Sequence, residues 1–182
     1  MNSEKVLSFF KEITRIPRES GHEEQIIAYL QDFAAKRSLV CKTDAAGNVL
    51  IVKEAASGYE NVPPIVLQSH SDMVCEKNRD VEFDFENDPI KTIVKGDWLY
   101  ADDTTLGADN GLGVAAIMAI MEDNTLTHGP LEALITADEE TGMFGAFGLK
   151  GGELEGSLLL NLDSEEEGVL YIGCAGGLDI TA

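Results

Sequence analysis

Apolar residues at helical spacing predict two helices near the start of the chain. The first follows Ser3, which can cap it, and ends before Pro17. The second follows a capping box from Ser20 to Glu23, whose two side chains would satisfy the first free backbone N–H groups. The apolar faces of the two helices consist of Val6, Leu7, Phe9, Phe10, Ile13, Ile26, Ile27, Leu30, Phe33 and Ala34.

Short runs of β-forming residues, bounded by turn residues, predict the strands. Residues 39–43 and 49–53 are expected to form two strands joined by a turn at 46–48. Residues 65–68 open with three consecutive apolar residues rather than an alternating pattern, which is typical of a strand buried on both faces. The remaining expected strands are the hairpin over 92–100 and the segments 131–137, 158–162 and 169–174.

Two further helices complete the predicted order of elements. Residues 112–122 have no polar face until their end, which indicates a helix inside the core, and residues 142–149 can hold a short helix. Strands that alternate with helices favour an α/β sandwich with a mostly parallel central sheet. Ligands of such sheets bind beyond the carboxyl ends of the strands.

Composition limits the possible functions. The 182 residues include 13 Lys and Arg and 33 Asp and Glu, giving a formal net charge of −20. This charge argues against nucleic acid and against an anionic membrane as partners. The cysteines Cys41, Cys75 and Cys174 are widely spaced, and no signal peptide is visible, so a reduced cytoplasmic protein is expected. The longest apolar run, 114–121, is too short to span a bilayer.

Ligand-type side chains stand at four places where an apolar run stops or a helix opens. Each of three predicted strands is followed by such residues, and a fourth acid lies among glycines before the core helix. Carboxylates and imidazole together are typical ligands of hard and borderline divalent cations. The candidate site residues are His70, Asp72, Asp109, Glu139, Glu140 and Asp163.

A pair of divalent cations needs a bridging carboxylate and further ligands for each ion. Asp109 is placed to bridge, because the surrounding glycines allow close approach of the backbone. His70 and Asp163 can bind one ion, and Glu140 the other. Asp72, two residues after His70, can accept the imidazole proton and fix its tautomer.

Glu139 is left for a different role, that of a general base that takes a proton from water and passes it to the leaving amine. Other interpretations fit less well. Residues 102–113 lack the spacing of a calcium-binding loop, and no Lys-Ser/Thr follows their glycines as a phosphate loop requires. A Cys75–His70 hydrolase remains possible by spacing, but Cys75 falls in a polar loop without a pattern of basic neighbours. His22 and His128 are interpreted as structural.

Four longer motifs resemble those of the bacterial aminoacyl-histidine dipeptidases, also called cytosol non-specific dipeptidases, which are co-catalytic zinc exopeptidases. The motifs are Leu67–Val74, Thr104–Gly111, His128–Glu132 and Asn161–Gly168. The resemblance implies the three-layer zinc-exopeptidase sandwich with a mixed, mostly parallel sheet. It also implies two divalent ions, zinc or else cobalt or manganese, and hydrolysis of Xaa-His and other unblocked dipeptides.

The same resemblance assigns roles to single residues. It implies that His70, Asp109, Glu140 and Asp163 are metal ligands, with Asp109 bridging. Asp72 then orients the histidine, Glu139 is the general base, and the Asp109–Asn110 peptide bond is cis.

The chain departs from this family in length. Family members carry a lid or dimerisation domain and a returning catalytic segment that supplies one more histidine ligand. Residues 1–182 are therefore predicted to be the N-terminal segment of the catalytic domain, and the full-length protein a homodimer. The alternative is an isolated acidic metal-binding fragment without turnover.

Overall fold

A five-stranded sheet forms the centre of the computed structural model, which describes residues 2–164, 166, 168–173 and 176. The strand order is β1-β2-β6-β3-β7. The strands are β1 Val40–Thr43, β2 Val49–Lys53, β3 Ile65–His70, β6 Leu131–Thr136 and β7 Leu158–Asn161. β3 pairs in parallel with β6 and β7, whereas β2 pairs antiparallel with β1 and β6. The predicted α/β class with a mixed central sheet is confirmed.

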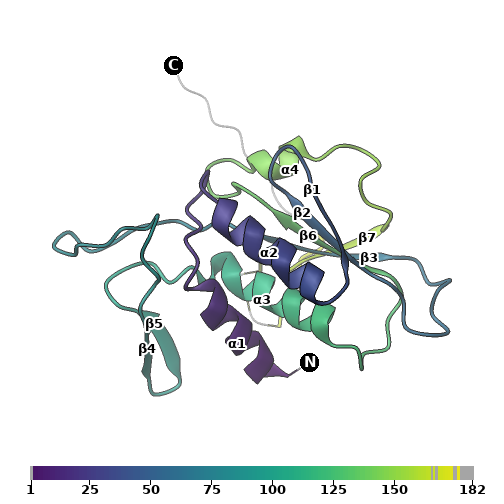
Figure 1. The fold of residues 1–182 in the computed structure, drawn as a ribbon, viewed down its shortest axis with the longest axis horizontal. Coiled ribbons are helices and arrows are strands. Elements are labelled where there is room, and N and C mark those ends of the chain that lie inside the picture. The colour runs from purple at the N-terminus through teal and green to yellow at the C-terminus, as the bar shows by residue number, and fades with distance from the viewer. Residues whose placement is uncertain (1, 165, 167, 174–175, 177–182) are drawn as a thin grey trace.

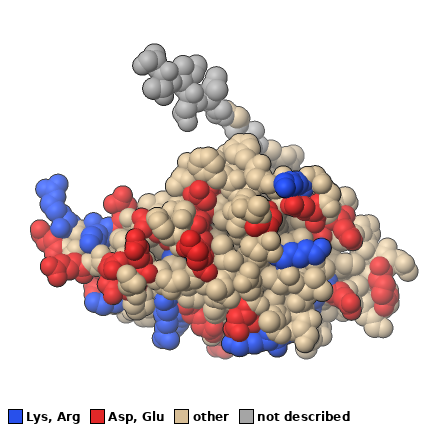
Figure 2. All heavy atoms as spheres, turned by 45° about the horizontal axis from the view of Figure 1, so that its top comes forward, with Lys and Arg blue, Asp and Glu red and all other residues tan. Residues whose placement is uncertain are grey.

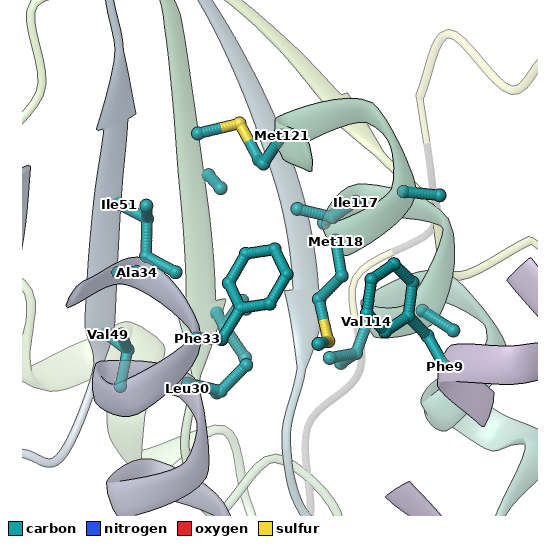
Figure 3. Packing of buried hydrophobic residues seen from close by; sticks show 14 of the residues in the cluster. Phe9, Leu30, Phe33, Ala34, Val49, Ile51, Val114, Ile117, Met118 and Met121 are labelled. Carbon is teal, nitrogen blue, oxygen red and sulfur yellow. The ribbon is translucent and has the colours of Figure 1, made fainter. Parts of the chain in front are cut away.

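Three helices form a layer on one face of this sheet (Figure 1). They are α1 Ser3–Ile13, α2 Glu24–Lys36 and α3 Ala108–Glu122. A shorter helix, α4 Phe144–Gly148, follows the carboxyl end of β6. In Figure 3, Phe33 of α2 and Met118 of α3 point into the space between the helices and the strands, and Phe9 of α1 points toward α3. This apolar layer fixes α3, and with it the loop that carries Asp109, against the sheet.

A separate two-stranded hairpin stands away from the central sheet (Figure 1). Its strands are β4 Thr92–Lys95 and β5 Trp98–Ala101, which pair antiparallel as the sequence predicts. Trp98 and Val94 are largely exposed on this hairpin. Among the described helices, none is long and apolar enough to cross a membrane.

Two predicted helix starts and one predicted strand differ from the structure. Asn2, not Ser3, caps α1 by accepting a hydrogen bond from the Glu4 N–H. α2 begins at Glu24 without a side-chain cap, because the Ser20 and Glu23 side chains bond to residues outside the helix. No strand forms over 169–173; Leu170 and Ile172 are fully exposed there, with no neighbouring strand among the described residues, and Cys174 lies outside those residues.

Candidate metal centre

The parallel pairing of β6, β3 and β7 brings three strand ends to one edge of the sheet. His70 is the last residue of β3, the loop after β6 carries Glu139 and Glu140, and Asp163 lies two residues beyond β7. The fourth segment is the start of α3, where Asp109 and Asn110 have non-helical backbone angles and are joined by a cis peptide bond. The structure thus brings together all six candidate residues named from the sequence.

His70 lies at the centre of this group and is almost fully buried. Its Nε2 atom is 3.2 Å from Asp109 Oδ1, 3.7 Å from Asp163 Oδ2 and 3.9 Å from Glu139 Oε2. Ligand atoms of His70, Asp109 and Glu140 all lie within 4.8 Å of one another, a spacing that could hold a metal ion. The other ring nitrogen, Nδ1, donates to Asp72 Oδ1 at 3.2 Å, which leaves Nε2 directed at the carboxylates.

Asp72 connects the histidine to the acidic loop. Its Oδ1 accepts the Glu139 N–H at 3.0 Å and its Oδ2 accepts the Glu140 N–H at 3.1 Å, while Ser20 Oγ donates to Oδ2 at 2.7 Å. Burial acts to raise the pKa of Asp72, but these bonds and the one from His70 hold that pKa far below its usual range. Asp72 is therefore an anion that orients both His70 and the backbone of the acidic loop.

Charge in the pocket is strongly unbalanced. Burial, and then the neighbouring acids, raise the pKa values of Glu139 and Glu140 despite the opposing effect of His70. Burial likewise raises the pKa of Asp163, against the opposing effects of Asn110 and His70. For His70, burial lowers the pKa, but Asp72, Asp163 and Glu139 outweigh it and raise the pKa to about 9. Crowded carboxylates of this kind favour a bound multivalent cation.

The donor set fits divalent metal ions. One imidazole nitrogen and several carboxylate oxygens converge without a thiolate, which suits zinc, manganese or cobalt. Burial raises the pKa of Cys75 to about 11, so this thiol stays protonated near neutral pH and the Cys75–His70 alternative is disfavoured. His128 Nδ1 bonds to the Gly129 carbonyl in its own loop, consistent with a structural role.

A second cluster of carboxylates lies behind the first. Ligand atoms of Glu23, Asp72 and Asp138 also lie within 4.8 Å of one another. Here the oxygens already accept hydrogen bonds: Glu23 Oε1 from the Asp138 N–H at 2.7 Å, and Asp138 Oδ1 from Thr141. This cluster shapes the loop that carries Glu139 and Glu140.

The sequence did not predict the supporting role of two residues, Asn110 and Arg18. Asn110 donates to Asp163 Oδ1 at 2.5 Å and to the Leu162 carbonyl at 3.1 Å, and it accepts a bond from Ser69 Oγ. Its position next to Asp109 in the glycine-rich motif could have indicated this supporting role. Arg18 is buried beneath the site, and no sequence pattern marks it, because its partners are backbone carbonyls far along the chain.

Comparison with known proteins first defines a class. No family model matches the chain. A solved tripeptidase from Staphylococcus aureus is 27% identical, with a TM-score of 0.76, over 91% of this chain and 44% of its own. The fold is thus that of a peptidase domain.

Within that class the chain is similar to one group over almost its whole length. The aminoacylhistidine dipeptidase of Vibrio alginolyticus is 47% identical, with a TM-score of 0.91, over 93% of this chain and 35% of that one. The cytosol non-specific dipeptidase of Escherichia coli (strain K12) is 50% identical over 173 residues, which are 95% of this chain and 36% of the relative. The chain therefore spans about a third of the length of these relatives. The resemblance predicted from the four motifs is confirmed.

Proposed function

We propose that this chain provides the metal-binding part of a dipeptidase that hydrolyses unblocked dipeptides, Xaa-His among them. The observation that carries the proposal is the convergence of His70, Asp109 and Glu140, whose ligand atoms lie within 4.8 Å of one another, with Asp163 beside them. The relatives named as dipeptidases supply the substrate class.

His70, Asp109, Glu140 and Asp163 would hold two divalent ions, with Asp109 between them. When bound, such ions polarise a carbonyl and lower the pKa of a water molecule. Asp72 accepts the proton of His70 Nδ1, so Nε2 is the ring nitrogen that would bind an ion. The same carboxylate fixes the Glu139 and Glu140 backbone, so the two side chains start from a defined position.

Glu139 is the proposed general base. Its side chain is about one third exposed, and Oε2 lies 3.9 Å from His70 Nε2, close to the proposed ligands. A raised pKa favours proton transfer, since the carboxylate that takes the proton from water can later give it to the leaving amine.

A homodimer in the cytoplasm stays a prediction from the sequence.

The variant Glu139→Gln tests the role of the general base independently of metal binding. In the full-length protein, we expect this variant to bind Zn²⁺ like the wild type and to lose about 10²- to 10⁴-fold in the rate of Xaa-His hydrolysis. Zinc content by elemental analysis and product release by chromatography measure the two effects. The control is Glu54→Gln, which changes an exposed acid and should leave both unchanged.

Three outcomes would count against this proposal or favour its alternative. Turnover at the wild-type rate in Glu139→Gln would contradict the assignment of the base. A full-length protein that binds zinc but hydrolyses no dipeptide would contradict the proposal. Turnover by the full-length protein but not by residues 1–182 alone would match the alternative, an isolated metal-binding fragment without turnover.

A further inference from the structure

Arg18 lies between α1 and α2, and only 1% of its surface is exposed. Its guanidinium donates from Nη1 to the Ser71 carbonyl at 3.0 Å and to the Asp72 carbonyl at 2.9 Å. From Nη2 it donates to the carbonyl of Gly107. The first two acceptors directly follow His70, and the third lies two residues before Asp109. One side chain thus joins two segments that are distant in sequence.

Two glycines, Gly107 and Gly111, leave space for the Arg18 guanidinium. A Cβ atom at Gly107 would lie 2.3 Å from Nη2, and a Cβ atom at Gly111 would lie 2.8 Å from it. Any other residue at either position would push against the guanidinium. The Arg18 backbone is bonded to the His70 side as well, since its carbonyl accepts the Met73 N–H at 3.0 Å.

The planar guanidinium is suited to this geometry. Its donors form a rigid fork, so one group can hold two backbone segments at a set separation, whereas the single ammonium of lysine cannot reproduce that fork. Burial lowers the pKa of Arg18 to about 10, against the opposing charges of Asp72, Asp109 and Glu140, so it remains a cation near neutral pH.

We propose that Arg18 is a positioning residue of the metal site, which holds the His70 segment and the Asp109 loop together so that His70 Nε2 and Asp109 Oδ1 face one ion. This inference rests on the proposed function. Arg18 would contact neither the ion nor the substrate and would act only through the backbone of the two segments.

Replacing Arg18 should change zinc affinity in opposite directions, depending on whether Arg18 acts through its charge or by positioning the two segments. A buried cation near a metal site repels a second cation, so its removal by charge alone would tighten zinc binding. Loss of positioning would weaken zinc binding, typically by about 10- to 100-fold for residues behind metal ligands. The sign of the change in zinc affinity therefore decides between the two.

The test is a calorimetric titration of the purified chain with Zn²⁺, in the wild type, Arg18→Met and Arg18→Lys. We expect both variants to bind zinc about 10- to 100-fold more weakly, including the lysine variant that keeps the charge. If Arg18→Met does not fold, Arg18→Lys carries the comparison. Thermal unfolding in the presence of a chelator measures the stability of each metal-free variant.

Arg37→Met is the matched control. Arg37 is partly buried, stacks on the Phe33 ring and pairs with Glu122, which lies at the opposite end of α3 from Asp109. It should lower the melting temperature and leave zinc affinity unchanged. Wild-type zinc affinity in both Arg18 variants, or tighter binding, would overturn the positioning role and leave the proposed function intact. Failure of the wild type to bind zinc would overturn both.

Discussion

At the scale of single residues, the site depends on buried side chains that hold its segments together, and Asn110 is one of them. Asn110 is 3% exposed, and its amide bonds to two other segments: to Ser69 of β3, and to the Leu162 carbonyl and Asp163 carboxylate just beyond β7. An amide suits this place because it both donates and accepts, so it can serve a hydroxyl on one side and a carboxylate on the other. Asp163 is held in place by this bond before any ion arrives.

Replacing Asn110 with alanine should therefore destabilise the protein. The Leu162 carbonyl would lose the amide donor, and the buried Ser69 hydroxyl would keep only the backbone carbonyl of residue 110, at a cost of about 1–3 kcal/mol. For a chain of this size each kcal/mol lowers the melting temperature by about 2–4 °C, which calorimetry can measure. The control is Gln31→Ala, which removes an exposed bond to Thr43 and should change stability by less than about 0.5 kcal/mol. Equal melting temperatures for the two variants would count against a supporting role for Asn110.

At the scale of elements, the carboxyl end of β6 and the short helix α4 determine where the acidic loop lies. The Gly145 N–H donates to the Ala137 carbonyl at 3.0 Å, and Asn48 Nδ2 donates to the Gly145 carbonyl at 2.8 Å. A Cβ atom at Gly145 would lie only 2.2 Å from the Ala137 carbonyl oxygen. Backbone packing between α4 and β6 thus sets both ends of the loop that carries Glu139 and Glu140.

Gly145→Ala should move α4 away from β6. Because the contact is with backbone atoms, which cannot rotate away, we expect a loss of about 1–3 kcal/mol in the free energy of unfolding. The displaced loop should also weaken Zn²⁺ binding, which the same titration measures. The matched control is Gly151→Ala, where a Cβ atom would meet no atom within 4 Å and neither quantity should change. Unchanged zinc affinity in Gly145→Ala would show that α4 does not position the acidic loop.

At the scale of the whole molecule, acidic residues dominate the charge, with a formal net charge of −20. Figure 2 shows acidic side chains spread over the face that it presents, with lysines and arginines scattered among them. One acid does join large parts of the fold: Glu122, in the last turn of α3, pairs with Lys5 of α1 at 2.5 Å and with Arg37 at the end of α2. The helix layer is therefore held by one ion-pair network in addition to its apolar core.

This network predicts a pH dependence of stability. Burial acts to raise the pKa of Glu122, but the bonds and charges of Lys5 and Arg37 outweigh it and lower that pKa. A carboxyl whose pKa is lowered by folding stabilises the protein above its unfolded pKa, about 4.3, and that contribution is lost as the pH falls through the folded value. Glu122→Gln should thus cost up to about 1 kcal/mol at pH 7, since the group is partly exposed and screened by solvent.

Urea unfolding of the wild type and of Glu122→Gln at several pH values measures this effect. The difference between them should shrink below about pH 4, as the wild-type carboxyl is protonated. At pH 7 it should also shrink in 1 M salt, which screens partly exposed charges. A difference that stays constant from pH 7 to pH 3 would mean that the ion pairs do not stabilise the helix layer.

The sequence by itself determined the elements with strong periodicity and the residue types at their ends. Apolar runs marked β2, β3 and β6, since burial requires apolar side chains whatever the partner strand is. The ligand-type residues after those runs were visible for the same reason, because polar side chains at a strand end interrupt an apolar pattern.

Only the tertiary structure decided which partner each polar group has. Ser20 and Glu23 fit a helix cap locally, yet they bond to Asp72 and to the Asp138 N–H, because a buried site with several charges needs more donors and acceptors than its own segments supply. Residues 169–173 have the composition of a strand but no strand beside them in the described part of the chain. A strand and a buried guanidinium such as that of Arg18 both need partners from elsewhere in the chain, and a linear pattern does not contain that information.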